Sequence, residues 1–173
     1  FPYTTLFRSP ITYDTSDESA KSVEAGRCDV LTSDQSQLYA QRIKLANPDD
    51  YVVLPEVISK EPLGPAVRQG DDEWNDIVRW TLFALIEAEE QGINSENAAE
   101  RARSADPGAQ RLLGTTGGFG SMLGLSDRWA YEAVRQVGNY GEIFARTLTP
   151  MGIDRGLNKL WSQGGLIYAP AMR

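Results

Sequence analysis

The pattern of the chain changes at about Asp72, and this change constrains the fold more than any other feature. Before it, short runs rich in Val, Leu and Ile alternate with helical segments. That order is typical of an α/β sheet with crossover helices. After it, apolar residues recur mainly at helical spacing. The sequence therefore predicts an α/β part up to about Ile58 and a mainly helical part from Asp72 onward.

Helix and strand signals alternate along the first part. Thr15 and Glu18 have the spacing of a capping box, which predicts a helix that ends at Gly26. Asp34 opens a second predicted helix, which extends to about Ala46. Runs rich in apolar residues predict extended strands at residues 28–32, 51–58 and 63–69.

The second part carries repeated helix signals. A long helix is predicted from Asp72 to Gly92, because apolar residues recur on one of its faces. Asn139 and Glu142 form a capping-box pair that opens a helix through Leu148. Further helices are predicted at residues 96–103, 108–113, 127–137 and 154–162, and residues 114–124 are expected to form a flexible glycine-rich surface loop.

The composition argues against several classes of function. The chain has no His and a single Cys, Cys28, so zinc, copper and haem sites would lack their usual ligands. A Ser or Cys nucleophile would also lack its customary base. The formal net charge is −7 and the 17 Lys and Arg residues are scattered, so no basic face is available for nucleic acid. We expect no catalytic residues, no metal, no cofactor and no nucleic-acid partner, while small zwitterions remain suitable ligands.

Direct insertion into a membrane is also not expected. The most apolar run, Ile77 to Ala88, is too short to span a bilayer and contains Arg79. Residues 1–9 fit no element that can be built onto the following chain, and we expect them to be a tag, a scar or an assembly artefact.

The segment Ala25–Asp34 is the most informative one for function. Here a predicted helix ends, a short strand follows, and an acid stands where the next helix begins. Ligands bind at the carboxyl ends of strands in open α/β sheets, where a carboxylate can hold an ammonium group. Asp34 can equally cap its helix, with Gln37 at the capping-box position, and on spacing alone such a cap is the commoner outcome. The residues by themselves leave both interpretations open.

Long motifs continue through the chain after Ser9. They are AGRCDVLTSD at 25–34, LANPDD at 45–50, VVLPEVISKEPLGP at 52–65, RQGDD at 68–72, IVRWTLFA at 77–84, QVGNYGEIF at 136–144, RGLNKLW at 155–161 and GGLIYAP at 164–170. Together they resemble the general L-amino-acid-binding periplasmic proteins, in the polar amino-acid group of ABC transporter solute-binding proteins. The resemblance corresponds to the later part of the family pattern.

The resemblance implies a type II periplasmic-binding-protein fold, in which two α/β lobes close on the ligand about a hinge. Residues 10–70 would then be a partial second lobe with the returning hinge strand. Residues 71–173 would be a helical region that completes the two-lobe fold, with its helices packing toward a missing first lobe. The chain is accordingly expected to be a C-terminal fragment.

The resemblance also implies a function and a site. The acid that binds the ligand's α-ammonium group in the family matches Asp34, so Asp34, Ser33 and Thr32 are the expected ligand-binding residues. The family's first-lobe Arg, which clamps the α-carboxylate, has no counterpart here. The implied protein is a periplasmic, non-enzymatic substrate-binding component of an ABC amino-acid importer, monomeric when full length, with an L-amino acid and membrane permease subunits as partners.

Three alternatives remain from the sequence. The same fold hosts enzymes, so a dehydratase-like activity on an amino acid or cyclic acid is one rival, and a ligand-binding sensory domain is another. Cys28 is interpreted as a small apolar filler on a strand, the alternative being half of a disulfide with a residue outside this chain.

Overall fold

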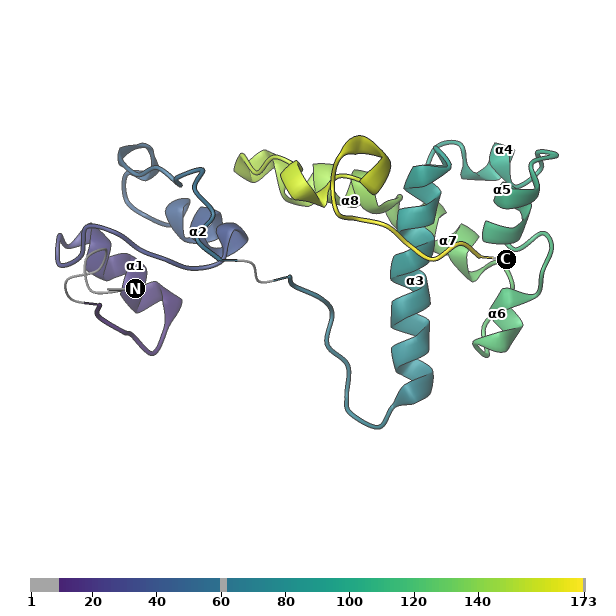
Figure 1. The fold of residues 1–173 in the computed structure, drawn as a ribbon, viewed down its shortest axis with the longest axis horizontal. Helices are drawn as coiled ribbons and strands as arrows, with labels where there is room; N and C mark the ends of the chain where they lie inside the picture. The colour runs from purple at the N-terminus through teal and green to yellow at the C-terminus, as the bar shows by residue number, and fades with distance from the viewer. Residues whose placement is uncertain (1–9, 60–61, 173) are drawn as a thin grey trace. The chain divides into compact units, whose positions relative to one another are not determined.

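The computed structural model describes residues 10–59 and 62–172. The chain divides into two compact units, Phe1–Pro62 and Leu63–Arg173, and each is described here by itself. Both are built from helices and loops (Figure 1). Over the described ranges, no helix combines the length and the apolar character needed to cross a membrane.

The first unit contains two short α-helices, as predicted. Helix α1 (Ser16–Glu24) begins at the expected cap, where Thr15 Oγ1 accepts a hydrogen bond of 3.2 Å from the Glu18 amide. Gly26 follows the helix with φ +67°, the left-handed conformation that a glycine adopts without strain. Helix α2 (Gln35–Arg42) is shorter than predicted, and a 3₁₀ turn, η1 (Pro48–Asp50), follows it.

The strands predicted at residues 28–32, 51–58 and 63–69 are a wrong prediction for this structure. The described part of the chain contains no β-ladder, only one isolated bridge in the second unit. A strand is stable only when a neighbouring segment satisfies its backbone and covers its side chains. These runs have the composition of strands but find no such neighbour among the described residues. The described residues are therefore mostly helical and form no sheet.

The second unit is a helical bundle built around its longest helix, α3 (Asp72–Glu90), which Figure 1 shows with α7 and α8 beside it. Asp71 caps α3 by accepting a 3.1 Å hydrogen bond from the Trp74 amide. The other elements are α4 (Ala98–Arg101), α5 (Pro107–Leu112), α6 (Phe119–Met122), α7 (Trp129–Val137), α8 (Tyr140–Thr147), η2 (Thr149–Met151), η3 (Gly156–Asn158) and η4 (Trp161–Gln163). The prediction of a mainly helical part after Asp72 is confirmed.

The core of the second unit lies where the carboxyl-terminal half of α3 meets the shorter helices. Its members are apolar and at most 9% exposed: Ala84, Leu85, Ala88, Ile93, Ala98, Ala109, Leu112, Leu113, Ala130, Tyr131, Val134 and Met172. Many are alanines, which lets α3 approach α7 and α8 closely. The first turns of α3 lie outside this core, and Trp74 there is 52% exposed.

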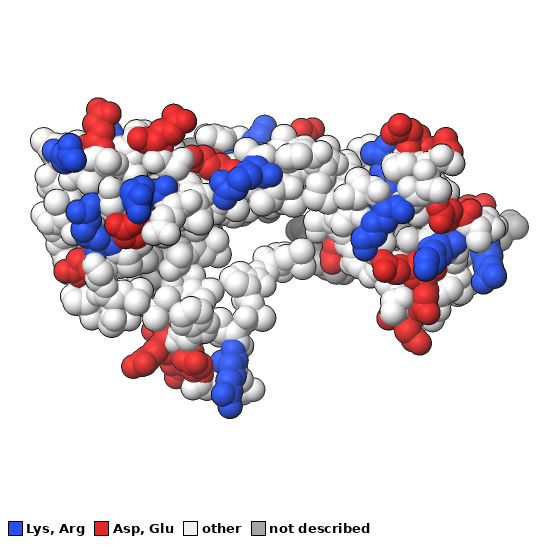
Figure 2. All heavy atoms as spheres, turned by 180° about the vertical axis from the view of Figure 1, so that it is seen from behind, with Lys and Arg blue, Asp and Glu red and all other residues white. Residues whose placement is uncertain are grey.

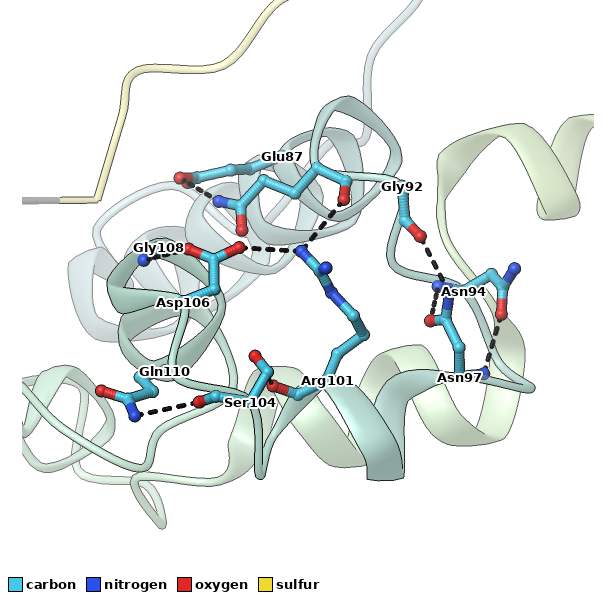
Figure 3. A network of polar contacts seen from close by, with 10 residues as sticks. Glu87, Gly92, Asn94, Asn97, Arg101, Ser104, Asp106, Gly108 and Gln110 are labelled. Carbon is cyan, nitrogen blue, oxygen red and sulfur yellow. Dashed lines mark hydrogen bonds and ion pairs between the residues drawn. The ribbon is translucent and has the colours of Figure 1, made fainter.

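A polar network fixes the chain where α3 ends (Figure 3). The Arg101 guanidinium donates to the Gln91 carbonyl and to Asp106 Oδ2, the latter at 2.9 Å. Asn94 and Asn97 bond each other's backbone amides, and the Asn97 amide group also donates to the Gly92 carbonyl. These bonds satisfy backbone groups that the helix end leaves free.

Two predictions in the second unit, one of a helix and one of a loop, need correction. The helix predicted at residues 154–162 is replaced by η3, η4 and a bridge between Leu160 and Ile167. Its backbone bonds to the following segment instead of to itself, because the Leu157 carbonyl accepts from Leu166 and the Trp161 amide donates to Ile167. The glycine-rich loop at residues 114–124 contains α6 and is packed closely against the backbone of residues 126–127.

The segment that follows this bridge ends against α3. The Met172 amide donates to Glu87 Oε2 at 3.3 Å, and the Met172 carbonyl accepts from Arg111 Nε at 3.3 Å. Met172 itself is only 7% exposed. The carboxyl-terminal residues therefore form part of the bundle and help to close its core.

Candidate functional site

The predicted ligand-binding residues lie on the loop that leads into α2. Thr32 and Ser33 are exposed, and Asp34 is half-buried at the N-cap position of the helix. The Asp34 backbone is extended (φ −55°, ψ 141°), as an N-cap residue requires. Its carboxylate, however, makes no cap hydrogen bond. The cap that spacing alone favoured is therefore not formed in this structure.

The role expected of Gln37 also differs from the structure. Its side chain accepts a 2.9 Å hydrogen bond from Ser33 Oγ and donates to Ser16 Oγ on α1. Gln37 therefore ties the loop before α2 to the first turn of α1 and is not a capping-box partner. The Asp34 carboxylate makes no bond to the helix either, so its oxygens are uncommitted to the helix.

Polar side chains also join the two helices of the first unit further along α2. Asp17 Oδ1 accepts from Gln41 Nε2 at 3.0 Å and lies 3.1 Å from Lys44 Nζ. The hydrogen bond from Gln41, together with that from Lys44, lowers the pKa of the Asp17 carboxyl group. At the other end of α1, Glu24 Oε1 accepts a hydrogen bond of 2.8 Å from the Ala46 amide. These bonds hold α2 against α1, and they thereby fix the position of Asp34 at the N-cap of α2.

The chemistry of the loop suits a small zwitterion. An ionised carboxylate accepts hydrogen bonds only, so Asp34 is matched to an ammonium group. The Thr32 hydroxyl can donate to a carboxylate oxygen, whereas the Ser33 hydroxyl already donates its proton to Gln37 and can only accept a further hydrogen bond, as from an ammonium group. The first turn of α2 adds backbone N–H groups and a positive partial charge that also favour an anion.

Two surface hollows, one in each unit, lie away from the predicted ligand-binding residues. One, of about 380 Å³, is in the first unit and is lined by Tyr13, Glu18, Lys21, Ser22, Ala25 and Arg27. The other, of about 170 Å³, is in the second unit and is lined by Ala99, Ala102, Arg103, Leu113, Gly114, Thr115, Arg128 and Tyr131. Neither of these two hollows includes Thr32, Ser33 or Asp34.

Cys28 is half-buried and has no disulfide partner among the described residues. Its sulfur accepts a 3.3 Å hydrogen bond from Ser22 Oγ and lies 4.0 Å from the Tyr13 hydroxyl. It therefore sits among hydroxyl groups and not on a strand. The alternative of a disulfide with a residue outside this chain stays a prediction.

The surface charge is mixed. On the face drawn in Figure 2, Lys and Arg side chains are interspersed with Asp and Glu side chains in both units. This interleaving agrees with the scattered basic residues of the sequence and favours no large anionic partner.

Three carboxylates of the second unit make long-range contacts that the sequence did not indicate, although Glu142 was predicted as half of a capping box. Glu87 is 9% exposed, and burial raises the pKa of its carboxyl group. Glu89 pairs with Arg155, and Glu142 accepts from the amide and hydroxyl of Ser95. Their partners lie 47 to 85 residues away, so no local pattern could have indicated them. All three hold segments of the bundle together.

Comparison with known proteins gives a consistent group of relatives, although no family model matches the chain. The chain is 60% identical to YhdW of Escherichia coli (strain K12) over 95% of its length. It is 51% identical, over its whole length, to the general L-amino acid-binding periplasmic protein AapJ of Rhizobium johnstonii. It is 47% identical over 95% of its length to the glutamate/glutamine/aspartate/asparagine-binding protein BztA of Rhodobacter capsulatus.

A solved structure agrees with these sequences. An ABC transporter periplasmic binding protein from Brucella ovis with glutathione bound superposes with a TM-score of 0.90 at 48% identity. The superposition covers 95% of this chain and 53% of that one. The chain likewise covers 50 to 52% of YhdW, AapJ and BztA, and so spans about half the length of the curated relatives it matches.

Proposed function

We propose that this chain, which is similar over nearly its whole length to the periplasmic binding proteins of amino-acid ABC transporters, forms part of the substrate-binding component of such an importer. The observation that carries the proposal is 47 to 60% identity to those proteins over at least 95% of the chain. A binding protein delivers its ligand unchanged, so we infer no catalytic role. The protein would work in the periplasm, with a permease as its membrane partner.

The proposed ligand-binding residues are Asp34, Ser33 and Thr32. Support comes from the Asp34 carboxylate, which makes no helix-cap bond, and from the two exposed residues before it. In this arrangement the carboxylate accepts hydrogen bonds from the α-ammonium group of an amino acid. The α-carboxylate requires donors from the other lobe, because this loop supplies only hydroxyls and backbone amides.

The finer fold assignment is part of the same proposal. Residues 10–70 would be a portion of a type II second lobe, and residues 71–173 the helical region that completes the two-lobe protein. The high TM-score against a solved binding protein supports this, although the described residues alone form helices and no sheet. The full-length protein, with both lobes present, would act as a monomer that closes on its ligand about a hinge.

The test is a chimera that joins this chain to the half of YhdW that it does not match. Isothermal titration against a panel of L-amino acids should detect binding. Glutathione belongs in the panel, because the Brucella ovis protein holds it and it carries a free α-ammonium and α-carboxylate. Asp34→Ala should weaken binding by about 2–5 kcal/mol, since the buried ammonium then loses its partner.

The matched control is Asp29→Ala, an exposed acid five residues earlier on the same loop. It should bind as the unchanged chimera does. Equal affinity for the Asp34→Ala and Asp29→Ala proteins would remove Asp34 from the site. A chimera that folds but binds none of the panel would refute the proposed function.

A further inference from the structure

The smaller of the two hollows is lined by helices α4 and α7 and by the segment that follows α5, three neighbouring parts of the second unit (Figure 1). Leu113 and Tyr131, which are 1% and 9% exposed, form its apolar base. Arg103 and Arg128 also line it, and both are exposed. No described residue that lines it is Asp or Glu. The hollow therefore combines a buried apolar base with two cations at its rim.

Backbone contacts of residues 114 and 115 bring the two arginines to the same hollow. Thr115 Oγ1 donates a hydrogen bond of 3.2 Å to the carbonyl of the residue before Arg103. Gly114 packs so closely against the residue before Arg128 that a Cβ on it would lie 1.7 Å from the Asp127 carbonyl oxygen. The wall between the two arginines is therefore held by contacts that do not use the arginine side chains.

Both guanidinium groups are available to a ligand. The ion pairs in the described part of the second unit engage other arginines, and neither Arg103 nor Arg128 makes a side-chain hydrogen bond to a described residue. Glu132 follows Arg128 by four residues, but its carboxylate is bonded to Arg135 at 2.9 Å. The Arg128 guanidinium carbon lies 4.1 Å from the centre of the Tyr131 ring. Stacking on a ring occupies the flat face of a guanidinium and leaves the N–H groups at its edge able to donate.

We propose that this hollow binds a small oxyanion, a carboxylate or a phosphate, between Arg103 and Arg128. The forked N–H donors of a guanidinium match the oxygen atoms of both groups. A volume of about 170 Å³ has room for about five water-sized groups, at about 30 Å³ for each, which suits acetate or inorganic phosphate. The lining residues all belong to the second unit, so the inference goes beyond the function proposed above and does not involve Asp34.

The experiment titrates the whole isotope-labelled chain with sodium phosphate, and separately with sodium acetate, while amide chemical shifts are followed by nuclear magnetic resonance. At least one of the two should shift the amides of Gly114, Thr115 and Arg128 until they saturate. The dissociation constant should be on the order of 1 mM, as expected for a few charge-assisted hydrogen bonds at an exposed site. Sodium chloride at the same ionic strength should give no saturable shift. Comparison of the phosphate and acetate titrations shows which oxyanion the hollow prefers.

Arg103→Gln and Arg128→Gln should each raise the dissociation constant about 10-fold, because each removes charged donors from the hollow. Arg128→Lys should also weaken binding, since an ammonium group keeps the charge but loses the forked donors and the stacking. The matched control is Arg68→Gln, which removes the same charge from an exposed arginine of the second unit that does not line the hollow. It should leave the dissociation constant unchanged. Circular dichroism of all the variants should match the parent chain, because the substituted side chains are exposed.

Three results would overturn the inference. They are shifts that grow linearly with both salts, equal shifts with chloride, or equal weakening of binding by Arg68→Gln. Each would mean that Arg103 and Arg128 are solvated surface charges that any salt screens. The amino-acid site is tested separately by Asp34→Ala in the chimera, so the failure of either proposal leaves the other standing.

Discussion

The Arg155 guanidinium and the Glu89 carboxylate form a bidentate ion pair, although they are 66 residues apart in the sequence. Nη1 lies 2.7 Å from Oε1 and Nη2 lies 3.2 Å from Oε2. The side chains are 19% and 13% exposed, and the guanidinium also lies 5.4 Å from the ring centres of Tyr140 and Phe144. The pair fastens the segment before η3 to α3, where water screens it little.

Removing this pair should destabilise the second unit. Arg155→Ala is expected to lower the free energy of unfolding by about 3 kcal/mol, because the Glu89 charge is left buried without a partner. Arg155→Lys should recover only part of that loss, since an ammonium group cannot make the two parallel bonds. Urea unfolding followed by tryptophan fluorescence measures both. Arg135→Ala, which breaks an exposed pair with Glu132, should change stability by less than about 1 kcal/mol, and a larger effect would contradict the role assigned to burial.

Asn139 is expected to be the most sensitive cap of the bundle. Its Oδ1 accepts from the Glu142 amide at 2.9 Å, and its Nδ2 donates 2.8 Å to the Ile93 carbonyl in a buried bond. Asn139→Ala should cost about 2–3 kcal/mol, because it removes a cap and leaves a buried carbonyl unpaired. Asn139→Ser keeps a cap acceptor and loses the amide donor without adding a charge. The same urea titration should therefore place Asn139→Ser between the parent and Asn139→Ala, and equal stability of all three would exclude the Ile93 bond.

Gly114 and Gly124 form a matched pair for testing the packing of the glycine-rich loop. Both have positive φ, +73° and +69°, so both substitutions by Ala carry the strain of the left-handed region. A Cβ on Gly114 would also lie 1.7 Å from the Asp127 carbonyl oxygen, whereas one on Gly124 meets open space. Thermal unfolding should show a loss of about 1 kcal/mol for Gly124→Ala. Gly114→Ala should lose far more or fail to fold. Similar melting temperatures for Gly114→Ala and Gly124→Ala would mean that the loop can move away from the Asp127 carbonyl at little cost in stability.

Glu87 should make the second unit more stable as the pH falls toward the ordinary carboxyl pKa of 4.5. Burial raises its pKa in the folded state, so the folded protein holds this proton more tightly than the unfolded chain does. That contribution is complete below the unfolded pKa and is lost as the pH rises through the folded one. The stability of the parent chain relative to Glu87→Gln should therefore increase between about pH 7 and about pH 4.5.

Glu132→Gln provides the opposite control for this pH experiment. Its hydrogen bond from Arg135 lowers the pKa of Glu132, so its contribution is present at neutral pH and lost as the pH falls through the folded value. The difference between the parent and Glu132→Gln should shrink on acidification, although the group is exposed and the effect small. Parallel pH curves for the parent and Glu87→Gln would show that Glu87 titrates normally.

The helices that could be predicted are those whose signals are local. Thr15, Asp71 and Asn139 each cap a helix through an amide three residues away, so the sequence alone indicates where these helices begin. The helix expected at residues 154–162 could not be rejected this way, because its backbone bonds are taken by residues 166–167. Whether such bonds form depends on packing that no short pattern records.

The strands and the candidate site were also predicted only as far as local sequence determines them. Residues 51–58 have a strand's composition, but a strand also needs a partner, and composition does not say whether one is present. The position of Asp34 directly before a helix was predicted correctly, since it depends on local sequence. The absence of its cap bond was not predicted, because the spacing of Asp34 and Gln37 permits a cap without requiring one. The hydrogen bond of the Gln37 side chain to Ser16, 21 residues away, has no local signal either.

The contact between Met172 and Glu87 has a consequence for biosynthesis. The two residues are 85 positions apart, and a ribosome adds residues in order, so α3 leaves the ribosome well before the segment that covers Glu87. During that interval Glu87 is in water as an ordinary ionised carboxylate, and the α3 core face stays uncovered. The bundle can therefore form most of its helices while the chain is still emerging, from the ribosome or from an export channel, but reaches its final packing only after Met172 has followed. A chaperone that protects apolar helix faces would have its longest opportunity on α3.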